Sequence, residues 1–461
     1  MSHDRTTTGF KETTRVADAL ATLREHVDPH GRTERVPLAA ADGRTLAAPV
    51  AADRPVPHED RAAMDGYAVR AADTFGANVR SPATLRVVTR PGETPDDTTG
   101  PTVRSGEARR VDTGEPLPAG ADAVVRVERV SRRDSAPTAD DATELAVETA
   151  VTTGANVASA GEDVTADQPL YDAGHRLRPA DLGLLRATGV SRVPVAERPA
   201  VAVIPTGEEL VAEDPGSGET VETNGHTLAQ FVARWGGVAT RRDPVPDDPE
   251  RLRAALAAAT DADAVVTTGG SAVGERDLVP EAIAEVGEVS VHGLALEPGH
   301  PAALGVVDDT PVVSLPGYPV ACLVVATQFL RPTVGRLAGG SVARFPIRRA
   351  TLTRKVASEP GTRTFARVRL QTADGAERDG TSSSGSSTGD WTPTDSTPAD
   401  DNCSAEPVRA AGAGVLSSVA LADGWVVVPE SREGFPAGTT VDVQLWSGPD
   451  AATAVAGGAS A

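Results

Sequence analysis

Cysteine is scarce in this sequence, and long apolar runs are missing. Its two cysteines among 461 residues, Cys322 and Cys403, are too few and too far apart for a disulfide framework or a zinc site, so we expect two free thiols. No stretch reaches the roughly 18 apolar residues of a membrane helix, and residues 1–15 lack the apolar segment of a signal peptide. We therefore expect a cytoplasmic protein without a membrane span.

Lysine is nearly absent, and positive charge is in short supply. The lysines are Lys11 and Lys355, and 44 basic residues face 65 acidic ones, giving a formal net charge of -21. This charge argues against duplex nucleic acid and anionic membranes as partners. An acidic, arginine-rich surface is typical of a halophilic protein, because concentrated salt screens the repulsion between its negative charges. A GC-rich genome would also enrich arginine and alanine. Of these two explanations for the composition, we prefer adaptation to high salt.

The most informative stretch runs from residue 261 to residue 329. An apolar segment at 264–266 ends in a Thr-Thr-Gly-Gly-Ser turn, and another at 312–315 runs into a Pro-Gly-Tyr-Pro turn before an apolar helix. Two such loops at the carboxyl ends of parallel strands suit a phosphate-bearing ligand. The stretch has neither GxGxxG nor the lysine of a P-loop, which excludes nucleotide sites built on those motifs.

Several motifs together carry a family resemblance. TTGGSAVGERD at 267–277, EPGHP at 297–301 and LPGYP at 315–319 resemble, in this order, the molybdopterin-binding domain of the MoeA and gephyrin-E family. Met-Asp-Gly-Tyr-Ala at 64–68, the Thr-Gly at 113–114 within RRVDTGEPLPAGADAVVRVE, and Gly-Glu-Asp at 161–163 match further signatures of that family. The resemblance covers most of the chain, and it implies an enzyme that inserts molybdate into molybdopterin.

The residues and the resemblance together predict a multidomain α/β plus β protein. Short strands at roughly ten-residue spacing favour a small all-β domain early in the chain, and alternating strands and helices after Pro199 favour a doubly wound sheet. The expected domains are an elongated N-terminal domain (10–52 and 153–195), an inserted β domain (53–152), a molybdopterin-binding α/β domain (196–342) and a C-terminal β-barrel (343–447). Residues 373–405 are rich in Ser, Thr, Gly and Asp, so we expect a disordered insertion there.

Local signals predict particular elements. The spacing of apolar residues predicts a helix over 13–24 with a threonine cap, and an Asp-Gly pair predicts a hairpin over 36–46. Asn224 is expected to cap a helix over 225–235, and the Asp248-Pro249 pair to open the next one. In the barrel we expect strands at 348–356, 364–370, 417–420, 424–428 and 440–445. Residues 132–141 are expected to form an exposed, flexible insertion.

Three acids mark the ligand edge of the α/β domain. Glu209, Asp247 and Asp277 follow successive strands, so they belong on one edge of the sheet. Carboxylate oxygen and substrate phosphate are the ligands Mg²⁺ prefers, which makes a magnesium site there a reasonable hypothesis. Loop carboxylates are also often helix caps or solvated charges, and by themselves would favour that interpretation.

The resemblance implies roles for individual residues. It implies catalytic roles for Asp65, Thr113, Asp163, Glu209, Asp247 and Asp277, with Glu209 and Asp277 as metal ligands. It implies substrate binding by Thr206, Gly207, Gly269, Gly270, Ser271, Gly274, Glu275, Pro298, Gly299, His300, Pro316, Gly317 and Pro319. The sequence departs from the family at Glu297 and His300, where lysines are usual, and at Tyr318 and Ala321, where Asn and Ser are usual.

The implied activity is that of a molybdopterin molybdenumtransferase. Such an enzyme takes molybdate and adenylylated molybdopterin as substrates, needs Mg²⁺ and releases AMP with the molybdenum cofactor. The resemblance also implies a homodimer with a shared active site and contact with the enzyme that adenylylates molybdopterin. The missing lysines leave two alternatives open: a non-catalytic molybdopterin-binding scaffold, and a paralogue that acts on tungstate.

The net charge yields a first prediction. Self-repulsion acts over a Debye length of about 30 Å at 0.01 M salt but only about 3 Å at 1 M. We therefore expect the melting temperature, measured by calorimetry, to rise with KCl up to molar concentrations. A melting temperature that stays flat over this range would leave genome composition as the explanation for the acidic residues.

Overall fold

The computed structural model describes residues 13–88, 102–133, 144–270, 277–340, 344–372, 403–408 and 416–446. The chain divides into two compact units, one formed by residues up to 32 together with those from 196 onward, and the other by residues 33–195. Within the described ranges, no helix is long and apolar enough to cross a membrane. Both cysteines are free, as predicted, and both are buried.

A six-stranded sheet forms the centre of the larger unit. Its order is β16 (Val238–Arg241), β13 (Ala200–Pro205), β17 (Ala264–Thr268), β21 (Thr310–Leu315), β20 (Ala303–Val307) and β18 (Glu288–His292). The first four are mutually parallel, and β20 runs antiparallel to both of its neighbours. Because the chain passes from β13 out to β16 and then back to β17, the strand order reverses between β13 and β17. Doubly wound sheets bind ligands at such a switch point.

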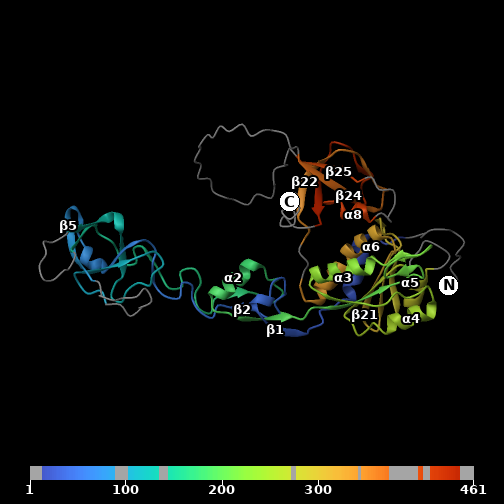
Figure 1. The fold of residues 1–461 in the computed structure, drawn as a ribbon, viewed down its shortest axis with the longest axis horizontal. Coiled ribbons are helices and arrows are strands. Elements are labelled where there is room, and N and C mark those ends of the chain that lie inside the picture. The colour runs from blue at the N-terminus through green and yellow to red at the C-terminus, as the bar shows by residue number, and fades with distance from the viewer. Residues whose placement is uncertain are drawn as a thin grey trace. The chain divides into compact units, whose positions relative to one another are not determined.

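Helices cover both faces of this sheet (Figure 1). Those on one face include α3 (Asn224–Trp235) and α6 (Pro319–Val325), and those on the other are α4 (Pro249–Ala257) and α5 (Leu278–Val286). Residues of β13 alternate between the two cores, with Val201 and Val203 on the α3 face and Ala202 and Ile204 on the α4 and α5 face. The predicted doubly wound fold is therefore confirmed.

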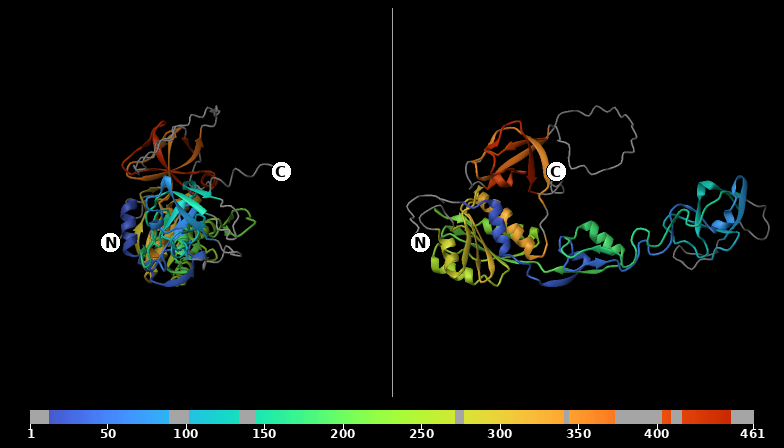
Figure 2. Two further views of the ribbon diagram at one scale, coloured as in Figure 1. Left: turned by 90° about the vertical axis from the view of Figure 1, so that its left-hand side faces the viewer. Right: turned by 180° about the vertical axis from the view of Figure 1, so that it is seen from behind.

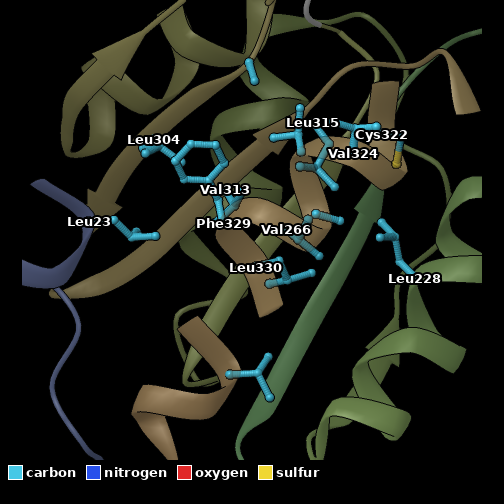
Figure 3. Close-up of a cluster of buried hydrophobic side chains, with 14 of the residues drawn as sticks. Leu23, Leu228, Val266, Leu304, Val313, Leu315, Cys322, Val324, Phe329 and Leu330 are labelled. Carbon is cyan, nitrogen blue, oxygen red and sulfur yellow. The ribbon is translucent and has the colours of Figure 1, made fainter. Parts of the chain in front are cut away.

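The core on the α3 face draws on distant parts of the chain (Figure 3). Its fully buried Phe329 lies among residues of the sheet, and Leu23 of α1 (Val16–Glu25) joins the same cluster. Both views of Figure 2 show α1 beside the α/β sheet. This packing differs from the expected grouping of the helix with residues 153–195. The N-cap is Arg15, which makes no side-chain cap bond, so the predicted threonine cap is wrong. The four domain limits stay a prediction.

The apolar helix predicted after Pro319 is continuous but not regular. It runs through α6, the π-helical turn η4 (Ala326–Leu330) and α7 (Arg331–Leu337). Pro332 is the second residue of α7, two positions after the π turn ends, and proline has no N–H to donate to the preceding turn. The wider π turn accommodates this break in the hydrogen-bond ladder.

The unit of residues 33–195 contains the predicted small β domain. Its sheet has the order β7 (Ala123–Arg126), β4 (Gly66–Val69), β6 (Glu107–Val111), β5 (Asn78–Val87), β9 (Glu144–Thr149) and β8 (Val130–Arg133). Strand β8 takes up the start of the flexible insertion expected from residue 132, and residues 134–143 lie outside the described ranges.

In the rest of that unit, strands from the beginning of the range 33–195 pair with strands from its end. The pairs are β1 (Thr33–Pro37) with β12 (Arg192–Ala196), β2 (Val50–Ala51) with β11 (Pro169–Tyr171), and β3 (Arg61–Ala62) with β10 (Val157–Ala158). The hairpin predicted over 36–46 is wrong. Residues 38–40 form a short 3-10 turn, and Thr45 and Leu46 bridge to Arg176 and Val195 instead. Long-range pairing overrides the local Asp-Gly signal here.

The C-terminal part forms the predicted barrel. Strands β24 (Arg363–Thr372), β25 (Cys403–Pro407), β22 (Ile347–Leu352), β28 (Thr440–Leu445) and β26 (Gly424–Val428) follow one another, and β26 pairs back to β24 to close it. Residues 417–420, predicted as a strand, form the helix α8 (Ser417–Ala420). The end of the expected disordered insertion, 403–405, belongs to β25, where Cys403 and Ala405 are buried in the barrel core. Residues 373–402 lie outside the described ranges.

A buried carboxylate holds the start of α2 (Pro179–Ala187) in the smaller unit. Asp181 is 2% exposed and accepts bonds from Arg178 Nη2 at 2.9 Å, His175 Nε2 at 2.8 Å and Tyr171 Oη at 3.2 Å. The guanidinium of Arg178, followed by His175 and Tyr171, holds the pKa of Asp181 well below its usual range. The folded state therefore favours the ionised form.

This network predicts a pH-dependent stability. The folded pKa of Asp181 lies below the unfolded value of about 3.9, so its contribution is present above that pH and is lost as the pH falls through the folded pKa. Asp181→Asn should lower the free energy of unfolding at pH 7 by about 2 to 3 kcal/mol and flatten its decline toward pH 3, measured by urea titration. The exposed Asp172→Asn is the matched control. Equal losses in the two variants would contradict this role.

Candidate functional site

Three loops meet at the switch point of the sheet. The loop after β13 begins at Thr206, whose N–H donates at 2.8 Å to the carbonyl of Thr268, the last residue of β17. The N–H of Gly269 donates to the Leu315 carbonyl of β21 at 3.0 Å. These bonds join the carboxyl ends of β13, β17 and β21 at one edge of the sheet. We call the backbone of residues 206, 268–270 and 315 the ledge.

Glycine is required at the centre of this ledge. Gly269 has a φ of +96°, and a Cβ there would lie 2.3 Å from the carbonyl oxygen of Thr206. Gly270 has a φ of +63°, and its Cβ would lie 2.6 Å from Cγ2 of Val279. Only a residue without a side chain allows this backbone conformation and this approach.

A cavity of about 860 Å³, which we call the sheet-edge cavity, opens over the ledge. Most predicted substrate-binding residues line it: Thr206, Gly269, Gly270, Pro298, Gly299, His300, Pro316, Gly317 and Pro319. Gly207 is not among its lining residues, although its N–H donates to the Val245 carbonyl at 3.0 Å beside them. Ser271, Gly274 and Glu275 lie outside the described ranges. The volume suits a drug-sized organic ligand.

Two of the predicted acids also line the cavity. The Glu209 carboxylate folds back over Gly207, where a Cβ would lie 2.6 Å from its Oε2. Burial, and then the charges of Glu209 and Glu208, raise the pKa of Asp247. A bound cation would relieve this repulsion. Among the described residues, no group of three or more His, Cys, Asp or Glu is placed to hold a metal ion.

Asp277 lies beside the cavity lining and not in it. The residue is 9% exposed, and its Oδ2 accepts from Nε2 of His292 at 2.7 Å. Its buried Oδ1 has no hydrogen-bond partner among the described residues. An unpartnered buried carboxylate oxygen calls for a partner, such as an ion or a water molecule, that the described residues do not supply. The sequence prediction missed His292, whose one signal was its position at the end of the next strand.

The smaller unit brings two predicted residues together. Oδ1 of Asp65 accepts from the hydroxyl of Thr113 at 2.7 Å and from its N–H at 2.8 Å. The Thr113 hydroxyl, followed by its N–H, lowers the pKa of Asp65. Asp65 therefore stays ionised while it remains exposed. Asp163 is also exposed, and its N–H donates to the Val56 carbonyl at 3.1 Å.

The departures from the family pattern change the charge of the cavity. Among the described residues that line it there is no lysine or arginine, while Glu222 and Glu297 add to its acids. His300 Nδ1 lies 3.6 Å from Glu297 Oε2, so these two side chains face one another. Ala321 is buried and Tyr318 is exposed.

Asn224 has a different role from the predicted cap. It is the first residue of α3 and follows the N-cap Thr223. Its Nδ2 donates to the carbonyl of Gly317 at 2.7 Å, which holds the loop after β21 in place. No local pattern could have found this contact, because the two residues lie 93 positions apart.

Comparisons with known proteins match most of the chain. Family models match for the N-terminal region of MoeA (domains I and II) over 14–189, a molybdopterin-binding domain over 202–336 and the C-terminal region of MoeA (domain IV) over 397–446. A molybdopterin biosynthesis protein of Methanocaldococcus jannaschii is 32% identical over 438 residues, covering 92% of this chain and 94% of that protein. Molybdopterin molybdenumtransferase 2 of Mycobacterium tuberculosis is 36% identical over 352 residues, covering 74% and 84%. The crystal structure of the molybdopterin biosynthesis MoeA protein of Pyrococcus horikoshii matches with a TM-score of 0.72 at 28% identity, covering 94% of this chain and 100% of that one.

The glycine ledge makes a testable prediction. Gly269→Ala and Gly218→Ala both place a side chain at positive φ, but only at Gly269 would the Cβ meet a backbone atom; at Gly218 nothing lies within 4 Å. We expect Gly218→Ala to lower the free energy of unfolding by about 1 kcal/mol through backbone strain. Gly269→Ala should cost about 1 to 3 kcal/mol more, because the loop must move. Urea titration in KCl measures both, and equal losses would mean that the ledge is not closely packed.

Proposed function

This chain belongs to the MoeA family, and we propose that its sheet-edge cavity is where molybdate replaces AMP on molybdopterin. As a family member it is a molybdopterin molybdenumtransferase that acts in molybdenum cofactor biosynthesis, the function for which its relatives are named. The observation that carries the assignment to this cavity is its position at the switch point, with glycine loops below it and carboxylates at its side.

The chain's own residues would bind and orient the substrate there. Gly269 and Gly270 let a phosphate group approach the backbone, since no side chain stands between them. The Pro316-Gly317 loop continues the cavity lining next to Gly269 and is held by Asn224. A substrate bound on these two adjoining loops would present its phosphoanhydride to the acids, and AMP is the group that leaves.

We propose Mg²⁺ as the cation of this site, with Glu209 and Asp277 as ligands and Asp247 nearby. The unpartnered Oδ1 of Asp277 supports a bound cation, and so do the burial and the neighbouring Glu209 and Glu208 charges that raise the pKa of Asp247. Mg²⁺ is usually held by one or two carboxylates together with water and phosphate, so the site needs no larger cluster of protein ligands. When bound, the ion neutralises phosphate oxygens and polarises the phosphoanhydride.

The remaining predicted catalytic residues would come from a second chain. We propose an isologous homodimer in which Asp65, Thr113 and Asp163 of one chain face the sheet-edge cavity of the other. The ionised and exposed Asp65 supports such a contact, because its charge is open to a partner. We further propose that the protein is halophilic, works in the cytoplasm and receives its substrate from the enzyme that adenylylates molybdopterin.

The scaffold alternative is not favoured, since relatives 27–36% identical are named as transferases. The function is tested by incubating the protein with adenylylated molybdopterin, molybdate and Mg²⁺ in high KCl and measuring AMP by chromatography. We expect AMP release that depends on molybdate. Tungstate in place of molybdate tests the choice of oxyanion. No AMP above the buffer control would instead support a scaffold.

Asp277→Asn should separate chemistry from folding. The change keeps the size of the side chain but removes the charge that a Mg²⁺ ligand needs, so we expect AMP release to fall at least roughly 100-fold. Asp309→Asn, an exposed carboxylate in the turn after β20, is the matched control and should keep full turnover. Melting temperatures of both variants should stay near that of the parent. Unchanged turnover and Mg²⁺ dependence in Asp277→Asn would exclude it as a ligand.

A further inference from the structure

Tyr318 presents an exposed aromatic ring in the sheet-edge cavity. The residue lines the cavity, and it is 65% exposed. Residues of the Phe, Trp and Tyr types make up only 3% of the sequence, and among the described lining residues only Tyr318 and His300 carry an aromatic ring. A single exposed aromatic residue is ordinary on a protein surface, but this one lies at the switch point where ligands bind.

The backbone that carries this ring is fixed. The preceding Gly317 accepts the bond from Asn224, and a Cβ on Gly317 would lie 3.4 Å from Cα of Gly269. The following Pro319 begins α6, and the carbonyl of Tyr318 accepts from the N–H of Cys322 at 2.9 Å. A ring on a fixed loop loses little conformational entropy when a ligand covers it, which favours binding.

We propose that the Tyr318 ring stacks on a planar fused heteroaromatic ring of the substrate, either the pterin or the adenine. The proposal rests on the function proposed above. Both rings are flat and apolar on their faces, and aromatic side chains stack on such faces in offset geometry. Tyr318 is thus a residue that determines affinity for the organic part of the substrate.

The charge of the cavity explains why a stacking contact would contribute to substrate binding. Without lysine or arginine among the described lining residues, the cavity gains little attraction for phosphate from its own side chains. Such attraction would in any case be screened within about 3 Å at 1 M salt. Stacking buries apolar surface, and salt does not weaken it. An aromatic ring therefore suits the binding of an anionic substrate by an acidic protein in concentrated salt.

The test compares Tyr318→Phe, which keeps the ring, with Tyr318→Leu, which removes it. We expect Tyr318→Leu to raise KM for adenylylated molybdopterin roughly tenfold, equivalent to about 1.4 kcal/mol, with kcat within about twofold of the parent. Tyr318→Phe should restore the parent KM within about twofold. Phe75→Leu, which removes another exposed ring (93% exposed) in the other unit, is the matched control and should leave KM unchanged.

Equilibrium dialysis with AMP and with neopterin, a soluble pterin, identifies the stacked ring. The probe whose affinity falls in Tyr318→Leu marks the partner of Tyr318. An unchanged KM in Tyr318→Leu, or a KM raised equally in the Phe and Leu variants, would overturn the proposal. If the parent releases no AMP, the proposed function fails. The dialysis then decides separately: tighter probe binding by the parent than by Tyr318→Leu supports stacking, and no difference overturns it.

Discussion

The close approach of three strand-end loops is the constraint on which the site depends. Parallel strands bring the ends of β13, β17 and β21 to one edge, and the reversal of strand order opens a crevice between the first two. The loops can touch there only because Gly269 and Gly270 have no side chain. The hydrophobic cores on both faces hold the strands, so their packing also fixes the geometry of the cavity.

Charge is the second determinant of this site. The cavity is lined by carboxylates, yet the substrate of a molybdenumtransferase carries phosphate and meets an anionic metal oxide. The cavity carboxylates and the substrate phosphate are both negatively charged, so a cation is needed between them. For this reason we propose that the acids hold Mg²⁺. The exposed ring of Tyr318 would add affinity that does not depend on charge. In our proposal, the acidic surface, the cation site and the stacking contact together allow the protein to bind an anionic substrate in concentrated salt.

Much of the fold and of the cavity could be predicted from the sequence, because local signals and burial agree in the α/β domain. The unbroken apolar run of β17 and the glycines after it predicted a buried strand and a ligand loop, and Asp248 caps α4 as expected. The failures involve contacts between distant residues. Nothing near Asn224 or His292 reveals their partners, and long-range bridges displaced the expected hairpin. Short apolar runs such as α8 fit a strand and a helix equally well.

The central claim is that the acids of two chains complete one reaction site. Asp65 lies in the unit of residues 33–195 and Asp277 in the other unit, so a mixed dimer of Asp65→Asn and Asp277→Asn chains would hold both lesions in one site and none in the other. The direct measurement unfolds the two inactive chains, reassembles them as an equal mixture and scores AMP release. Random pairing makes half of the dimers mixed, so activity should recover to roughly a quarter of the parent value. A mixture as inactive as either variant alone, with mixed dimers shown to be present, would contradict the shared site.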